Sequence, residues 1–194
     1  MLDAALALLQ ERSLDDFTLQ DIATRGRVSI GSIYHRFASK SELIRAAHLR
    51  TMERMRTEEL LLMKRLARHR SLPELIPVLI EEIAELVRRH ARALAPQMIV
   101  ARDDTVMRAA GLNGYQRFAA EVHGVLLLHL KEIRPADPRR AVEAVFRVVW
   151  AALSRHLGLN VPRRPFDPGA WQIEKQDLAD MCLAYLTSRS TQRR

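Results

Sequence analysis

The stretch at residues 18–43 marks three helix starts in close succession, and this spacing constrains the fold more than any other feature of the chain. Thr18 and Ser29 each precede a run that is typical of a helix, and both are good N-cap residues. Ser39 with Glu42 three residues later forms a capping box that opens a third helix. The order of helix, tight turn and helix is that of a DNA-binding helix-turn-helix, whose second helix lies in the major groove.

The same stretch is locally basic. Between Asp21 and Glu42 there is no acidic residue, whereas the segment carries Arg25, Arg27, Arg36 and Lys40. Phosphates dominate the affinity of proteins for nucleic acid, so this local positive charge favours a DNA-binding surface. The net charge of +8 for the whole chain permits nucleic-acid binding but does not locate it.

The second helix of this stretch begins with small or flat side chains, at Ser29, Ile30, Gly31 and Ser32. They allow a helix to approach base edges and bring backbone N–H groups near phosphate. Tyr34 suits either a phosphate contact or packing, and His35 suits either DNA contact or solvent, whereas Ile33 and Phe37 are predicted to be core. The predicted DNA-binding residues are Thr18, Arg27, Ser29, Ile30, Gly31, Ser32, Tyr34, His35 and Lys40.

This pattern resembles the DNA-binding domain of the TetR family of bacterial transcriptional regulators. The resemblance covers roughly the first quarter of the chain, and it implies an all-α fold of about nine helices. A three-helix DNA-binding domain is expected at residues 1–46, followed at 47–194 by a helical bundle for ligand binding and dimerisation. The matching positions are Ala4–Leu9, Phe17–Thr18, Asp21–Ala23, Val28–Ser29, Gly31, Tyr34, Phe37, Lys40 and Leu43.

One position departs from the family pattern. The family usually carries Ala-Gly in the turn where this chain has Gly26–Arg27. A positive φ favours glycine, because a Cβ there costs roughly 1 kcal/mol. Two alternatives follow: the turn is shifted by one residue, or Arg27 accepts some strain.

The rest of the chain has apolar residues at helical spacing and no strand pattern. One long helix is predicted from Lys40 past Arg65, and Ser71 with Glu74 opens the next. Pro96, Gly111 and Gly114 predict that residues 91–114 break into one or two shorter helices. Further helices are predicted at 115–133, 138–159 and 170–188, with a loop at 161–169.

The last two predicted helices are apolar over most of their circumference, so each must be covered on two sides. This pattern suits a four-helix interface between two copies of the chain, and the resemblance implies the same homodimer. A purely monomeric core is the alternative. The predicted interface residues are Val149, Leu153, Leu157, Leu178, Cys182, Leu183 and Leu186.

The sequence offers no catalytic constellation, no phosphate-binding glycine loop and no metal-ligand spacing, so neither enzyme activity nor a cofactor is expected. Cys182 is the only cysteine, which excludes an intrachain disulfide and favours a reducing cytoplasm. No apolar run reaches the roughly 18 residues of a membrane span, and no basic region typical of a signal peptide opens the chain.

Two classes of function remain. The first is a homodimeric repressor that binds a palindromic double-stranded DNA operator and is released by a small, largely apolar effector in the C-terminal bundle. The second is an all-α enzyme or small-molecule carrier with a vestigial helix-turn-helix, which the missing catalytic set disfavours. The candidate effector-binding residues, each of which also suits an ordinary core, are Met98, Met107, Tyr115, Phe118, Phe146 and Trp150.

Overall fold

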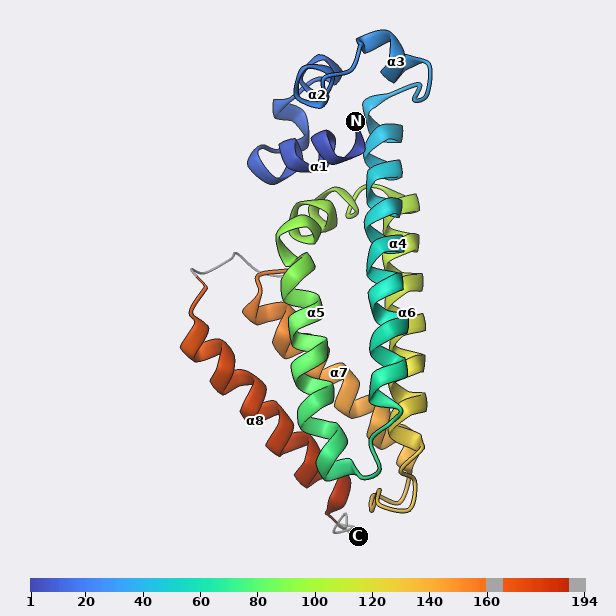
Figure 1. Ribbon diagram of the computed structural model, residues 1–194, viewed down its shortest axis with the longest axis vertical. Helices are drawn as coiled ribbons and strands as arrows, with labels where there is room; N and C mark the ends of the chain where they lie inside the picture. The colour runs from blue at the N-terminus through green and yellow to red at the C-terminus, as the bar shows by residue number, and fades with distance from the viewer. Residues whose placement is uncertain (160–165, 189–194) are drawn as a thin grey trace. The chain divides into compact units, whose positions relative to one another are not determined.

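The computed structural model describes residues 1–159 and 166–188, and the regular structure within these ranges is entirely helical (Figure 1). The all-α fold is thereby confirmed, with eight α-helices and one short 3-10 helix in the described ranges where about nine helices were predicted. Most of the predicted loop at 161–169 lies outside the described residues. The elements are α1 (Leu2–Glu11), η1 (Leu14–Asp16), α2 (Leu19–Gly26), α3 (Ile30–Tyr34), α4 (Lys40–Leu66), α5 (Leu72–Val100), α6 (Thr105–Leu127), α7 (Pro138–His156) and α8 (Pro168–Thr187).

Packing divides the chain into two compact units. The N-terminal unit consists of Met1–Arg56 and His90–Gly114, and the C-terminal unit consists of Thr57–Arg89 and the chain from Tyr115 onward. The long helices α4, α5 and α6 each contribute to both units. The predicted division at residue 46 falls inside the continuous helix α4 and stays a prediction.

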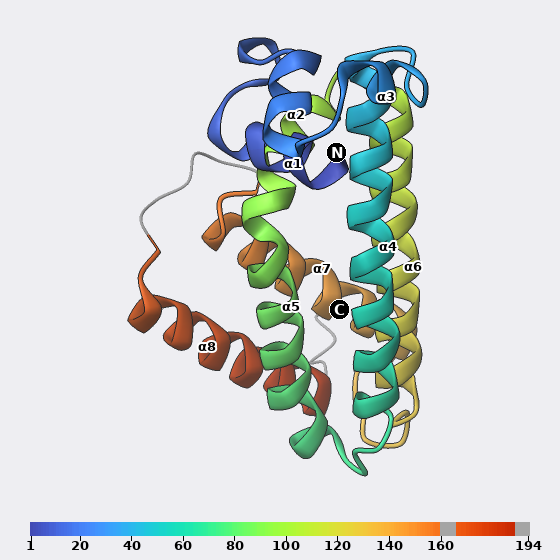
Figure 2. The ribbon, with the colours of Figure 1, turned by 45° about the horizontal axis from the view of Figure 1, so that its top comes forward.

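The N-terminal unit gathers α1, α2 and α3 beside the first turns of α4 (Figure 2). Its core takes buried side chains from all of these helices, and Met107 of α6 joins it. Met107 thus packs in the core of the N-terminal unit, whereas the aromatic candidate effector residues belong to the C-terminal unit. Burying one such side chain contributes about 1.5–3 kcal/mol. The buried core residues include Leu8, Leu9, Phe17, Ile22, Ile33, Leu43 and Ile44.

The prediction of short helices at 91–114 is wrong. Helix α5 continues through Pro96 to Val100, and α6 contains both Gly111 and Gly114. The helices are interrupted between the end of α5 and the start of α6, where Asp104 Oδ1 accepts hydrogen bonds from the N–H groups of Val106 and Met107, each over 3.0 Å. An aspartate cap therefore sets the start of α6, and the proline and glycines are tolerated inside helices that packing supports.

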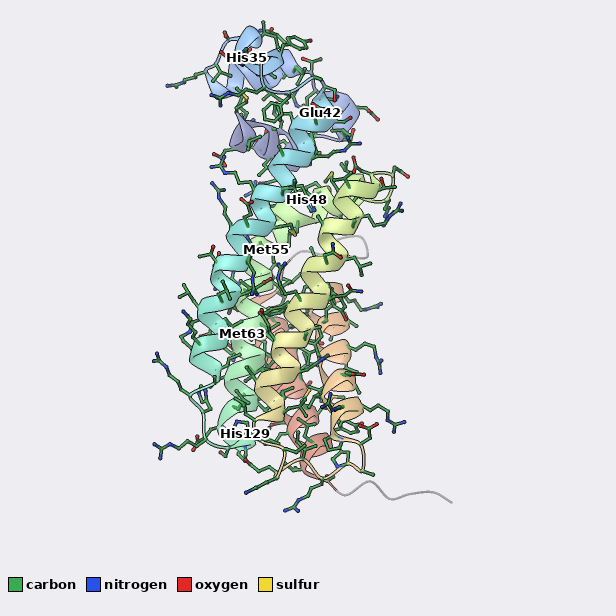
Figure 3. The ribbon with its side chains drawn as sticks, turned by 90° about the vertical axis from the view of Figure 1, so that its right-hand side faces the viewer. His35, Glu42, His48, Met55, Met63 and His129 are labelled. Atoms are coloured by element: carbon green, nitrogen blue, oxygen red, sulfur yellow. The ribbon has the colours of Figure 1, made fainter. Side chains whose placement is uncertain are left out.

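A buried polar cluster joins α4 to α5 within the N-terminal unit (Figure 3). His48 Nδ1 lies 2.8 Å from Gln97 Oε1, and Gln97 Nε2 donates to the Ala93 carbonyl over 2.8 Å. Because Gln97 Oε1 is only an acceptor, His48 carries its proton on Nδ1 in this arrangement. Arg45 adds an ion pair with Asp104 at 2.6 Å, which ties α4 to the start of α6.

In the C-terminal unit, α7 and α8 pack against each other and each begins at an aspartate cap followed by proline. Lys175 of α8 is buried and contacts two carboxylates of α5, Glu81 at 2.7 Å and Glu85 at 3.3 Å. Trp171 Nε1 also donates to Glu85, over 2.9 Å. These contacts fix α8 on α5 because the buried ammonium has no other anionic partner among the described residues. None of the described helices is apolar over a length that could cross a membrane.

Candidate nucleic-acid interface

The start of α2 is held by a reciprocal cap between Thr18 and Asp21. The Asp21 N–H donates to Thr18 Oγ1 over 3.2 Å, and the Thr18 N–H donates to Asp21 Oδ2 over 2.6 Å. The N–H of Thr18, followed by its hydroxyl, lowers the pKa of Asp21 below its ordinary value. The predicted cap is confirmed. The Thr18 hydroxyl caps the start of α2, and Thr18 is exposed to solvent.

The turn between α2 and α3 places Arg27 in the left-handed region, with φ 50° and ψ 45°. Gly26 remains the last residue of α2, so the turn is not shifted and strain at Arg27 is the alternative that the structure shows. A left-handed residue with a Cβ costs about 1–2 kcal/mol. A Cβ on Gly26 would lie 3.4 Å from Ala4 Cβ, which shows how closely α2 approaches α1 here.

Helix α3 is short and presents one anchored face and one open face. Ser29 caps it by accepting the Ser32 N–H over 3.1 Å, and Ile33 is fully buried. Tyr34 is 60% exposed, which favours a contact with an external partner over packing. His35 lies at the surface where α3 ends (Figure 3). The exposed residues of this face are Ser29, Gly31, Ser32, Tyr34 and His35, whereas Ile30 is half-buried.

Part of the local positive charge is already paired with an acidic side chain. Arg25 forms a bidentate ion pair with Glu11 of α1 at 2.6 and 2.7 Å, and these hydrogen bonds lower the pKa of Glu11. Arg27 and Arg36 are exposed and make no side-chain hydrogen bond or ion pair within residues 1–159 and 166–188. Arg36 was absent from the predicted contacts, although the charge pattern contained it.

Lys40 has an internal role that the sequence did not predict. Its Nζ donates to the carbonyls of Leu14 and Phe17, each over 2.7 Å, and lies 5.1 Å from the centre of the Phe17 ring. These bonds tie the start of α4 to the segment between α1 and α2. Two of the three ammonium donors are therefore engaged, and a phosphate contact by Lys40 stays a prediction.

Replacing Lys40 with methionine is expected to destabilise the N-terminal unit by about 2 kcal/mol, because two charge-assisted hydrogen bonds are lost while the apolar stem is kept. Thermal unfolding and amide hydrogen exchange at Leu14 and Phe17 measure the effect. Lys64→Met on the exposed face of α4 is the control and is expected to melt like the wild type. Equal melting of both variants would show that these carbonyl contacts carry no stability.

Four of the six candidate effector residues come together in the C-terminal unit. Tyr115, Phe118, Phe146 and Trp150 form an aromatic cluster with ring centroids 5.3–6.4 Å apart. The remaining two, Met98 and Met107, belong to the N-terminal unit. His123 completes the cluster with its ring 5.7 Å from Phe146 and its buried Nε2 without a hydrogen-bond partner. Apart from its place on the predicted helix, nothing in the sequence pattern indicated this histidine.

The stability of the C-terminal unit should depend on pH through His123. Burial, opposed by the charge of Glu143, lowers the pKa of His123 below its ordinary value. The unfolded chain therefore binds the proton at higher pH than the folded chain, so stability falls as pH drops below about 6.5 and levels off below the folded pKa. As pH falls from 8 to 5, the melting temperature of the wild type is expected to fall relative to that of His123→Leu. A gap that is constant across this range would contradict the assignment.

The predicted dimer residues lie mainly inside the chain. Leu183 is half-buried, and burial of Cys182 raises the pKa of its thiol to about 11. The outward faces of α7 and α8 carry different apolar residues, Val148, Ile173, Met181 and Tyr185. The predicted residues that are buried in the single chain are Val149, Leu153, Leu157, Leu178, Cys182 and Leu186.

The helix-turn-helix just described also has a counterpart among known families. The sequence model described as "Bacterial regulatory proteins, tetR family" matches residues 1–47. The N-terminal segment at residues 1–47 therefore matches the TetR family. The matched TetR segment contains α1, α2, α3 and the first turns of α4, so the match coincides with the capped helices and the turn at Arg27. No curated protein sequence matches the chain.

Solved structures of TetR-family regulators share the fold of this chain beyond the matched segment. A solved structure assigned to the TetR-family regulators of Mesorhizobium loti has a TM-score of 0.77 at 16% identity, with 94% of this chain and 93% of that chain covered. The fatty acid degradation regulator FadR from Bacillus halodurans has a TM-score of 0.68 at 15% sequence identity, with 97% of this chain and 95% of that chain covered. The ketosteroid transcriptional regulator KstR2 of Mycobacterium tuberculosis has a TM-score of 0.62 at 20% sequence identity, with 97% of this chain and 93% of that chain covered. At these identities the likeness concerns the fold alone.

The described residues have the fold of solved TetR-family transcriptional regulators. Across the described ranges, no three side chains of histidine, cysteine, aspartate or glutamate are grouped to hold a metal ion.

Proposed function

We propose that this chain is a homodimeric repressor that binds a palindromic operator in double-stranded DNA and is released by a small, largely apolar effector. The open face of α3 carries the proposal. Ile33 anchors the helix to the core, so Ser29, Ser32 and Tyr34 are held on the side that faces away from it. Small side chains there let the helix approach base edges. Arg27 and Arg36, which make no side-chain hydrogen bond or ion pair with the described residues, flank the helix and can contact phosphates.

The effector is proposed to bind at the aromatic cluster of the C-terminal unit. The cluster supplies an apolar surface, and its half-buried members Tyr115 and Trp150 offer access from solvent. One structural neighbour is described as a fatty acid degradation regulator and another as a ketosteroid transcriptional regulator, which agrees with an apolar effector. Such an effector releases DNA only if it binds the DNA-incompetent conformation more tightly.

A gel-shift titration on the DNA upstream of the chain's own gene tests this function. Specific binding is expected to exceed binding to a shuffled fragment by at least about 1,000-fold at physiological salt, and to weaken steeply as salt rises. Equal affinity for both fragments would rule out an operator in that region.

Arg27→Gly is expected to change stability and DNA affinity in opposite directions. The strain at Arg27 has no compensating side-chain contact in the described part of the chain, so glycine should raise stability by about 1 kcal/mol. If Arg27 contacts a phosphate, the variant should bind all sequences more weakly and lower the log–log salt slope by roughly 1. Melting curves and salt titrations measure the two effects, and Arg27→Lys, which keeps the charge, is the control. An unchanged slope in Arg27→Gly would exclude Arg27 from the interface.

A further inference from the structure

A surface groove of about 780 Å³ lies within the N-terminal unit. It is bounded on one side by the end of α1 and by η1, and on the other by the end of α5 and the start of α6. Leu9, Ile44 and Met107 are buried core residues that reach its surface, so the floor is apolar. Pro96 and the exposed side chain of Ile99 extend the apolar lining. This volume is within the range of sites for small organic molecules.

The rim of the groove is acidic although the chain as a whole is basic. Its lining holds five carboxylates and two guanidinium groups, which leaves a local excess of negative charge. The guanidinium groups belong to Arg12 and Arg45. The carboxylates belong to Glu11, Asp15, Asp16, Asp103 and Asp104.

Several of these carboxylates already have partners. Glu11 pairs with Arg25, and Asp104 accepts from Arg45 and from two backbone N–H groups at the start of α6. Asp15 and Asp103 are exposed and make no side-chain hydrogen bond or ion pair in the described ranges. One comes from η1 and the other from the turn before α6, so the two walls of the groove each supply an unneutralised carboxylate.

We propose that this groove is a second ligand site that binds a small amphipathic cation. The apolar body of the ligand lies on Leu9, Ile44 and Met107, and its ammonium group lies at the rim that Asp15 and Asp103 make acidic. Burial of the apolar body supplies affinity, and the charge at the rim favours a cation over anions and neutral isosteres. The site is built entirely from the N-terminal unit and does not involve the aromatic cluster proposed for the effector.

The groove touches the elements that hold the helix-turn-helix in place. Leu14 lines it and also accepts a hydrogen bond from Lys40, while Arg45 and Asp104 join α4 to α6 at its edge. A ligand that binds only the folded unit stabilises it by mass action, so the thermal unfolding of the unit reports occupancy.

A matched pair of probes tests the proposal on the full chain. The cationic probe is 2-(1-naphthyl)ethylamine, and its neutral isostere is 2-(1-naphthyl)ethanol. At low salt and pH 7 the amine is expected to bind at least about 10-fold more tightly than the alcohol by calorimetry, and to lose this advantage as salt rises. The methyl NMR signals of Met107 and Ile44 are expected to shift with the amine.

Three variants decide whether the rim carries the charge recognition. Asp15→Asn and Asp103→Asn are each expected to weaken amine binding about three- to ten-fold and leave alcohol binding unchanged. Asp177→Asn, an exposed acid on α8 outside the groove, is the control and should bind both probes like the wild type. The proposal is overturned by equal affinity for the two probes, by absence of amine binding, or by unchanged amine affinity in both rim variants.

Discussion

Gly31→Leu is expected to fold normally and to lose operator binding by at least about 100-fold. A Cβ at Gly31 would meet only Ser29 Oγ, at 3.9 Å, so an added side chain extends into solvent and clashes with nothing in the fold. If this face enters the major groove, the leucine displaces the helix and weakens several contacts together. Loss of two contacts at about 1–3 kcal/mol each is sufficient for the expected change.

The stability of the folded protein should not decrease in the Gly31 variants, in contrast to operator binding. Glycine inside a helix costs roughly 0.5–1 kcal/mol relative to alanine, so Gly31→Ala and Gly31→Leu should melt no lower than the wild type. Gly111→Leu is the matched control, because a Cβ at Gly111 of α6 meets no atom within 4 Å. This control is expected to fold and to bind operator normally in the same gel shift.

Two results would change the assignment of α3. Normal operator binding by Gly31→Leu would mean that the DNA-facing side of the helix is rotated away from Gly31. Unfolding of Gly31→Ala would make Gly31 a packing residue, and DNA contact would then rest on Ser29, Tyr34, His35 and the neighbouring cations.

The capped helix starts could be predicted from sequence because capping is local. Thr18 with Asp21, Ser29 with Ser32, and Asp137 with Arg140 each lie three residues apart, so the chemistry of the cap is written in a few neighbouring residues. The apolar spacing of α4 and α7 was likewise sufficient to predict both helices, because a helical face repeats every turn. The sequence misplaces the helix break because Pro96 and the two glycines are residues that commonly interrupt helices, whereas the aspartate cap at Asp104 sets the actual start of α6.

Partners distant in sequence could not be predicted. Arg25 pairs with Glu11 and Lys40 with two carbonyls, so the positive charge counted in the sequence overstates the charge that is left for an external partner. The same limit applies to the ligand and dimer residues. Periodicity shows that a residue lies on an apolar face, but it does not tell whether that face meets its own chain or a second one, as Leu153 on α7 demonstrates.

The double variant Val148→Glu with Met181→Glu is expected to be monomeric and to bind a palindromic operator about 100- to 10,000-fold more weakly. Val148 is 48% exposed on α7 and Met181 is 61% exposed on α8, so both face outward from the C-terminal unit. Exposed apolar side chains on adjacent helices suit an interface between two copies. A monomer engages one half-site alone and loses the gain that comes from binding two linked sites.

Sedimentation velocity and the gel shift measure the two consequences of this variant. The predicted interface residue Leu153 is fully buried, so glutamate there would test folding more than association. Leu61→Glu is the matched control, because Leu61 is an exposed leucine on α4 and is expected to leave the dimer intact. An intact dimer in the double variant would place the partner surface away from Val148 and Met181, while normal melting with a monomeric sedimentation coefficient would establish that the outward faces of α7 and α8 hold the two copies together.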